Sequence, residues 1–249
     1  ESDKREMEGL WGKIIKAICI IFAIFQLYTA AFGILDATLQ RAVHLMFGFL
    51  LIFLLYPARK SWSRTSMHPL DLLFALVGAG TCLYLITQFD ELVLRAGMNT
   101  DTDVYIAIVG IMLVFEAARR VVGWPMIIVA LLFIMYSFFG PYMPGLIAHR
   151  GVDVDELVSH LFYTTEGIFG TPMGVSSTFI YLFILFGSYL EATGLGKFFI
   201  DIANAIAGWA AGGPAKVAVL SSGLMGTVSG SSVGNVAGTG AFTIPMMKK

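Results

Sequence analysis

Small and polar residues near the C-terminal end of the sequence have the types and spacing of a binding site. They interrupt the otherwise apolar segment 213–249 and comprise Gly226, Ser229, Gly230, Ser231, Ser232, Asn235 and Thr239. As one straight helix, residues 214–247 would be about 51 Å long, whereas the hydrocarbon core of a bilayer is roughly 30 Å thick. The segment therefore predicts a re-entrant hairpin with arms at 214–225 and 233–247 and the Gly/Ser cluster at its tip.

The tip of such a hairpin offers ligands for a cation and for an anion. Backbone carbonyls at 224–228 are expected to be unpaired and to carry the negative end of the first arm's dipole, which favours a cation. The predicted metal ligands are Gly226, Ser229, Gly230, Ser231 and Asn235. Amides that open the second arm favour a carboxylate. The predicted substrate-binding residues are Ser231, Ser232, Asn235 and Thr239. For Thr239, a hydrogen bond to a carbonyl of its own helix is favoured over contact with a substrate.

Two other interpretations of this segment stay open. Gly226, Gly230, Gly234 and Gly238 recur every four residues, which is also the small-xxx-small pattern of close helix packing. Residues 230–234 fit the G-x-S-x-G nucleophile motif of serine hydrolases. That motif requires a preceding strand and a later histidine, whereas all four histidines of this sequence lie upstream.

Composition indicates a membrane protein of the all-α polytopic class. Apolar residues make up 57% of the 249 residues and charged residues 13%, compared with about 25% charged residues in soluble domains. The net charge of −1 and the lack of a basic tract argue against nucleic acid as a partner. Cys19 and Cys82 fall in different apolar segments, so we expect free thiols rather than a disulfide.

Six segments are predicted to cross the membrane as helices, at 12–35, 39–56, 69–89, 104–122, 125–139 and 173–190. With a cytoplasmic N-terminus, thirteen of the sixteen Lys and Arg residues lie inside, and Arg41, Arg95 and Arg150 lie outside. This bias follows the positive-inside rule and requires the hairpin to return to the cytoplasmic side. Segments 153–162 and 197–209 are predicted as interfacial helices outside and inside, the first with Asp153 and Glu156 at capping-box spacing.

Four polar residues within or beside the spans have structural interpretations. Glu116 precedes Arg119 and Arg120 by three and four residues, which favours an ion pair over a proton relay. Asp71 is predicted to complement the dipole of its helix, and Glu191 to cap its helix rather than contact the hairpin. A packed, hydrogen-bonding role is expected for His44.

The C-terminal part of the chain resembles a known transporter family. The runs LFYTTEGIFGTPMGVSSTFIYLFILFGSYLEATGLGKFFIDIANAIAG and GTVSGSSVGNVAGTGAFTIPMMKK, within 157–249, resemble the large membrane subunit of tripartite ATP-independent periplasmic (TRAP) transporters. Within that family, SGSSVGNVAGTGAFTIP is similar to fused permeases that work with TAXI-type substrate-binding proteins. The helices before residue 123 are similar, less specifically, to the small membrane subunit. The predicted domains are therefore 1–122 and 123–249.

The resemblance implies a permease component, not an enzyme, in the inner membrane of a prokaryote. It implies import of a small organic acid by an elevator mechanism, coupled to a sodium or proton gradient. The implied partner is a periplasmic TAXI-type binding protein. No cofactor is expected, and Na⁺ is a candidate coupling ion beside the proton. A second hairpin is expected beyond residue 249, so the chain reads as the N-terminal part of a longer permease; a complete small membrane protein is the alternative. An ion channel with a re-entrant pore loop remains the second function class, and an intramembrane serine hydrolase the third.

Overall fold

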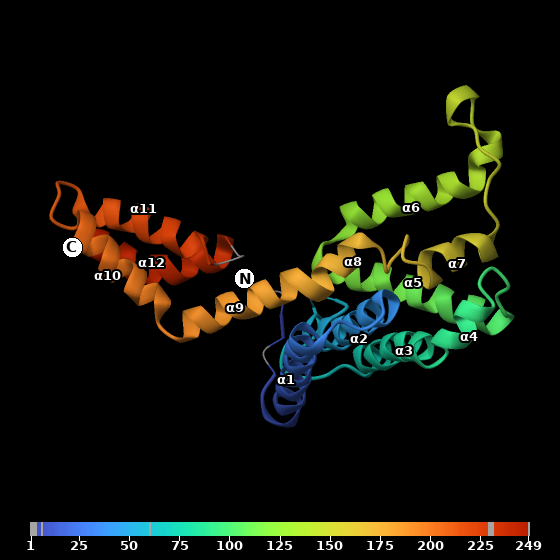
Figure 1. Ribbon diagram of the computed structural model, residues 1–249, viewed down its shortest axis with the longest axis horizontal. Helices are drawn as coiled ribbons and strands as arrows, with labels where there is room; N and C mark the ends of the chain where they lie inside the picture. Colours follow the sequence, from blue (N-terminus) through green and yellow to red (C-terminus); the bar gives the residue numbers. More distant parts are fainter. Residues whose placement is uncertain (1–3, 6, 60, 229–231, 249) are drawn as a thin grey trace. The chain divides into compact units, whose positions relative to one another are not determined.

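The computed structural model describes residues 4, 5, 7–59, 61–228 and 232–248, and all regular structure within them is helical (Figure 1). Ser229, Gly230 and Ser231 of the predicted hairpin tip lie outside the described residues. Ser232 and Glu191 are described for their backbone only. The chain divides into two compact units, Glu1–Ser177 and Thr178–Lys249. The predicted boundary at residue 122 separates a part that resembles the small membrane subunit from a part that resembles the large one. The two compact units do not test this boundary, which stays a prediction.

The first unit contains the helices that the apolar segments predict. Its α-helices are α1 (Gly9–Phe32), α2 (Ala37–Leu55), α3 (Pro69–Thr87), α4 (Phe89–Leu94), α5 (Asp101–Val121), α6 (Trp124–Phe139), α7 (Val154–Tyr163) and α8 (Thr171–Val175). Two short 3₁₀ turns, η1 (Gly140–Tyr142) and η2 (Gly145–Ile147), follow α6. A π-helical turn, η3 (Ser176–Ile180), continues α8 into the second unit, which holds α9 (Tyr181–Ala192), α10 (Leu195–Ala207), α11 (Gly213–Gly226) and α12 (Ser232–Lys248).

Five described helices are long and apolar enough to span a membrane, so the all-α polytopic fold class is confirmed. They are Gly9–Phe32, Ala37–Leu55, Pro69–Thr87, Trp124–Tyr142 and Thr171–Leu190. The remaining predicted span, 104–122, forms α5, which has 21 residues but carries Glu116, Arg119 and Arg120 near its end. Its crossing of the membrane stays a prediction.

Local sequence signals explain where several helices begin. The Asp36 carboxylate accepts a hydrogen bond from the amide of Thr38 and caps α2, and Pro69 opens α3 at a position that needs no amide donor. One predicted signal is wrong: Asp153 precedes α7, but its side chain makes no capping bond. Its proposed partner Glu156 instead accepts a hydrogen bond from Arg150 at 2.5 Å, because a guanidinium ion is a stronger donor than a backbone amide.

The core of the first unit is aromatic and depends on close approach at two glycines. Phe49 packs over Gly78, where a Cβ atom would lie 2.8 Å from its ring, and so joins α2 to α3. Phe162 of α7 packs over Gly110 of α5, where a Cβ atom would lie 2.3 Å from its ring. Both phenylalanines are fully buried, so α7 is fastened to α5 along one face.

The second unit has a small core between α10 and the hairpin arms. Ile200 and Ala203 of α10 are buried with Val217 of α11. Phe198 of α10 and Trp209, two residues beyond its end, are 56% and 85% exposed. Thus α10 presents one apolar face to the hairpin and another outward, which suits a helix that lies at a membrane surface.

Candidate functional site

The predicted hairpin is present as two helical arms, α11 and α12, which pack on each other and on α10 (Figure 1). The first arm tightens at its end, where the amides of Thr227 and Val228 donate to the carbonyls of Leu224 and Met225, both at 3.1 Å. The Leu224 carbonyl also accepts from the Thr227 hydroxyl at 2.6 Å. The prediction of unpaired carbonyls is therefore wrong for these two residues, since a 3₁₀-type closing turn pairs them. A carbonyl oxygen keeps a second lone pair for another ligand.

Asn235 ties the second arm to the first. Its Nδ2 atom donates to the Ser222 carbonyl at 3.0 Å, and the Ser222 hydroxyl lies 3.5 Å from its Oδ1 atom. A Cβ atom on Gly226 would lie 3.5 Å from Asn235 Nδ2, so the structure brings these two predicted metal ligands together. Sequence reasoning missed Ser222. It lies on the first arm, thirteen residues before Asn235, and two short arms that fold back on each other bring residues at such a separation together.

Thr239 makes the intrahelical bond that its position favoured. Its hydroxyl donates to the Asn235 carbonyl at 2.7 Å, and Thr243 repeats this bond to the Thr239 carbonyl at 2.9 Å. Both threonines are buried, as is Ser221 on the first arm. The hydroxyl oxygen of Thr239 keeps its acceptor capacity, so its contact with a substrate stays a prediction, as does that of Ser232.

The segment before the G-x-S-x-G motif is helical, which removes the structural basis for a nucleophile elbow. The described residues preceding the motif form α11 and its closing turn rather than a strand. A nucleophile elbow holds its serine on a sharp strand-to-helix turn.

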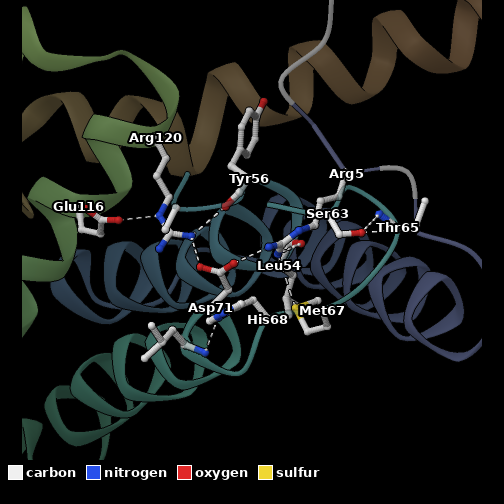
Figure 2. Close-up of polar contacts among 12 residues, drawn as sticks. Arg5, Leu54, Tyr56, Ser63, Thr65, Met67, His68, Asp71, Glu116 and Arg120 are labelled. Atoms are coloured by element: carbon white, nitrogen blue, oxygen red, sulfur yellow. Dashed lines mark hydrogen bonds and ion pairs between the residues drawn. The ribbon is translucent and has the colours of Figure 1, made fainter. Parts of the chain in front are cut away.

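The helix ends of the first unit hold a buried network of charged side chains. Asp71 lies between Arg5 and Arg120 and accepts from them at 2.5 and 2.7 Å (Figure 2). All three side chains are fully buried. Glu116 accepts from Arg119 and Arg120 at 2.7 and 2.8 Å, which confirms the predicted ion pair. The sequence placed Asp71 correctly in the first turn of its helix but missed its two arginine partners.

Arg119 and Arg120 also donate hydrogen bonds to backbone carbonyls of the segment that follows α2. Arg120 donates to the Tyr56 carbonyl at 2.8 Å, and Arg119 donates to the Ala58 carbonyl at 3.0 Å. The guanidinium group of Arg120 also lies over the ring of Phe53, 4.7 Å from its centroid. These bonds join the start of α3 and the end of α5 to the chain that follows α2, so the network is a structural frame.

A second buried carboxylate, Asp103, closes the opposite ends of α3 and α5. It accepts from Tyr84 at 2.6 Å and Arg95 at 2.9 Å, and from both the amide and the hydroxyl of Thr100 at 2.8 Å. Burial raises the pKa of this carboxyl, but the bonds from Tyr84 and Thr100 and the charge of Arg95 outweigh it. The pKa of Asp103 is therefore lower than its usual value, and the ionised form is favoured.

Intramembrane polar side chains of α1 and α2 bind the π-helical turn. His44 is hydrogen-bonded as expected, with Gln26 Nε2 2.9 Å from its Nδ1 atom and Ser176 Oγ 3.1 Å from its Nε2 atom. Gln40 donates to the Ser177 carbonyl at 3.3 Å. A π-helical turn shifts the backbone hydrogen bonds by one residue relative to an α-helix, and the Gln40 amide donates to one of the carbonyls in this turn.

Comparison with known proteins gives a family for the second half of the chain. Residues 109–249, more than half of the sequence, match the family described as "Tripartite ATP-independent periplasmic transporter, DctM component". A protein of Haemophilus influenzae named as a TRAP transporter large permease is 41% identical over 66 residues. This alignment covers 26% of the present chain and 16% of the relative. No solved structure shows a significant match to the chain.

Proposed function

Because the chain belongs to the family of the DctM component of TRAP transporters, we propose that it is part of a permease that imports a small organic acid through a prokaryotic inner membrane. The observation that carries this proposal is the two-armed hairpin α11–α12, which lies inside the matched residues and carries buried hydroxyl groups. In membranes, paired half-helices of this kind are found at substrate and ion sites.

In this proposal a cation and a carboxylate bind side by side at the hairpin tip. Gly226 and Asn235, which lie together across the arms, contribute oxygens to the cation with Ser229, Gly230 and Ser231. The amides that open α12 face the substrate carboxylate, since they carry the positive end of the helix dipole. The substrate-binding residues Ser231, Ser232, Asn235 and Thr239 surround it.

The same proposal assigns the energy source, the partner and the mechanism. Sodium or protons drive the import, and a periplasmic TAXI-type binding protein delivers the acid. Residues 1–122 belong to a fused small-subunit scaffold, and the hairpin belongs to a transport domain that moves as an elevator. Support comes from the resemblance of residues 213–249 to fused permeases of this type and from the charge bias, which favours a cytoplasmic N-terminus.

Uptake by the complete permease in proteoliposomes tests this function. We expect uptake of labelled organic acid only when the purified binding protein and an inward sodium or proton gradient are both present. Asn235→Ala should weaken the cation dependence about five- to 150-fold, because an unsatisfied buried polar partner costs about 1–3 kcal/mol. Ser188→Ala is a matched control, since this exposed hydroxyl donates to the Ile184 carbonyl of its own helix and, among the described residues, to no other group. Ion currents without binding protein would instead establish a channel.

A further inference from the structure

A cleft of about 270 Å³ opens between α4, α7 and the turn before α2 in the first unit. Its lining is part polar and part apolar, and includes Asp36, Thr38, Phe89, Asn99, Ser159 and Tyr163. A volume of this size admits one long side chain of a partner. None of the residues of this cleft belongs to the hairpin, so the hairpin proposal leaves it without a role.

Exposed apolar side chains stand beside the cleft. On α4 and the turn after it, Val93, Leu94 and Met98 are 58%, 81% and 73% exposed. The same short helix carries Asp90 and Glu91, which are also exposed. Two ionised carboxylates in one helical turn oppose its insertion into hydrocarbon, so these apolar residues face an aqueous or interfacial environment. An exposed apolar group with a polar rim is typical of a protein contact surface.

The rim of this surface is acidic. Asp101, Asp153 and Asp155 are exposed at the same end of the unit as Asp90 and Glu91, and Asp155 accepts only an uncharged amide bond from Asn99 among the contacts described. The neighbouring guanidinium groups are already paired. Arg95 binds the buried carboxylate of Asp103, and Arg150 binds Glu156. The surface therefore presents an excess of negative charge.

We propose that this cleft and the exposed face of α4 dock a basic patch of the soluble substrate-binding protein. The proposal rests on the function given above. A lysine or arginine of the partner enters the cleft toward Asp36 and Asn99, and apolar side chains of the partner cover Leu94 and Met98. A second copy of this chain would bring the same acidic rim against itself and be repelled. Anionic lipid headgroups would be repelled in the same way.

Binding of the purified binding protein to the complete permease in nanodiscs tests the surface. The test variant is Asp90→Asn/Glu91→Gln. The control is Glu8→Gln/Asp201→Asn, which neutralises two exposed carboxylates, the first before α1 and the second on α10. We expect affinity of the wild type to fall between about 50 and about 300 mM salt, because the attraction is screened. The test variant should bind about three- to tenfold more weakly at low salt, with a flatter salt dependence. Leu94→Ser should weaken binding without changing the salt dependence.

Two results would overturn the docking surface while leaving the transporter intact. One is wild-type affinity and salt dependence in both the Asp90→Asn/Glu91→Gln variant and the Leu94→Ser variant, together with uptake that still requires the binding protein. The other is a change in the oligomeric mass of the permease in these variants, which would make the face an interface between copies. Uptake that needs no binding protein would overturn the function itself, so the two failures are distinguishable.

Discussion

Replacement of Asp71 by asparagine is expected to destabilise the first unit strongly. The asparagine side chain has the same shape but no charge, and it leaves the buried guanidinium groups of Arg5 and Arg120 without their shared anion. An amide accepts with one oxygen and presents its NH₂ group to the other arginine, so at least one donor loses its partner. Breaking a buried ion pair by removing one charge costs about 3–5 kcal/mol.

The measurement uses a buried thiol as the reporter of unfolding. Cys82 is fully buried, whereas Cys19 is exposed, so the experiment is done on a Cys19→Ser background with a thiol-reactive dye and a temperature ramp. At about 2–4 °C per kcal/mol for a chain of this size, a cost of 3–5 kcal/mol lowers the unfolding temperature by about 6–20 °C.

The control separates the ion network from the helix dipole. Asp101 lies in the first turn of α5 as Asp71 lies in that of α3, but it is exposed. Asp101→Asn removes only a dipole contribution of about 0.3–1 kcal/mol. Equal shifts in the two variants would refute the argument, since Asp71 would then act only on its own helix. A double variant with Arg5→Gln should cost less than the sum of the two single changes, because the charges are coupled.

Three further predictions concern the helix contacts. Gly110→Ala should lower the unfolding temperature because its Cβ atom would enter the ring of Phe162, and Phe162→Leu should recover part of the loss; no recovery would contradict this. On acidification below about pH 4, the stability that ionised Asp103 contributes to the fold is lost, because the pKa of Asp103 is lower in the folded state than in the unfolded state. The Asp103→Asn variant should show a smaller acid-induced drop in unfolding temperature, and equal drops would contradict the assignment. Gln40→Ala should speed amide exchange at 176–180, while unchanged exchange would show that the π-helical turn needs no side-chain support.

The positions of the helices were predictable because apolar runs and their breaks are local signals. All six predicted spans form helices whose ends lie within three residues of the predicted ones. The hairpin arms and both amphipathic helices are also present. Proline and glycine fix these boundaries through backbone geometry alone, which needs no knowledge of tertiary contacts.

Side-chain partners were predictable only where they lie within one or two helical turns. The pairing of Glu116 with Arg119 and Arg120 follows from their spacing. Asp71 finds its partners 66 and 49 residues away, and no periodicity reports such distances. The contact of Asn235 with Ser222 required the length of the turn between two arms, and the capping box at Asp153 failed because Arg150 captured Glu156.

The bond between Arg5 and Asp71 has a consequence for the order in which the chain is assembled. The two residues are 66 positions apart, so at about 5–20 residues per second the ribosome delivers Asp71 roughly 3–13 seconds after Arg5. Throughout that interval the arginine stays hydrated, and under the predicted cytoplasmic N-terminus it also helps to hold the first helix in its orientation. Arg120 arrives later still, with the last residues of α5. The ion network at this end of the bundle is therefore completed only after α5 has been synthesised, and a ribosome stalled before residue 120 leaves Asp71 without its second counter-ion.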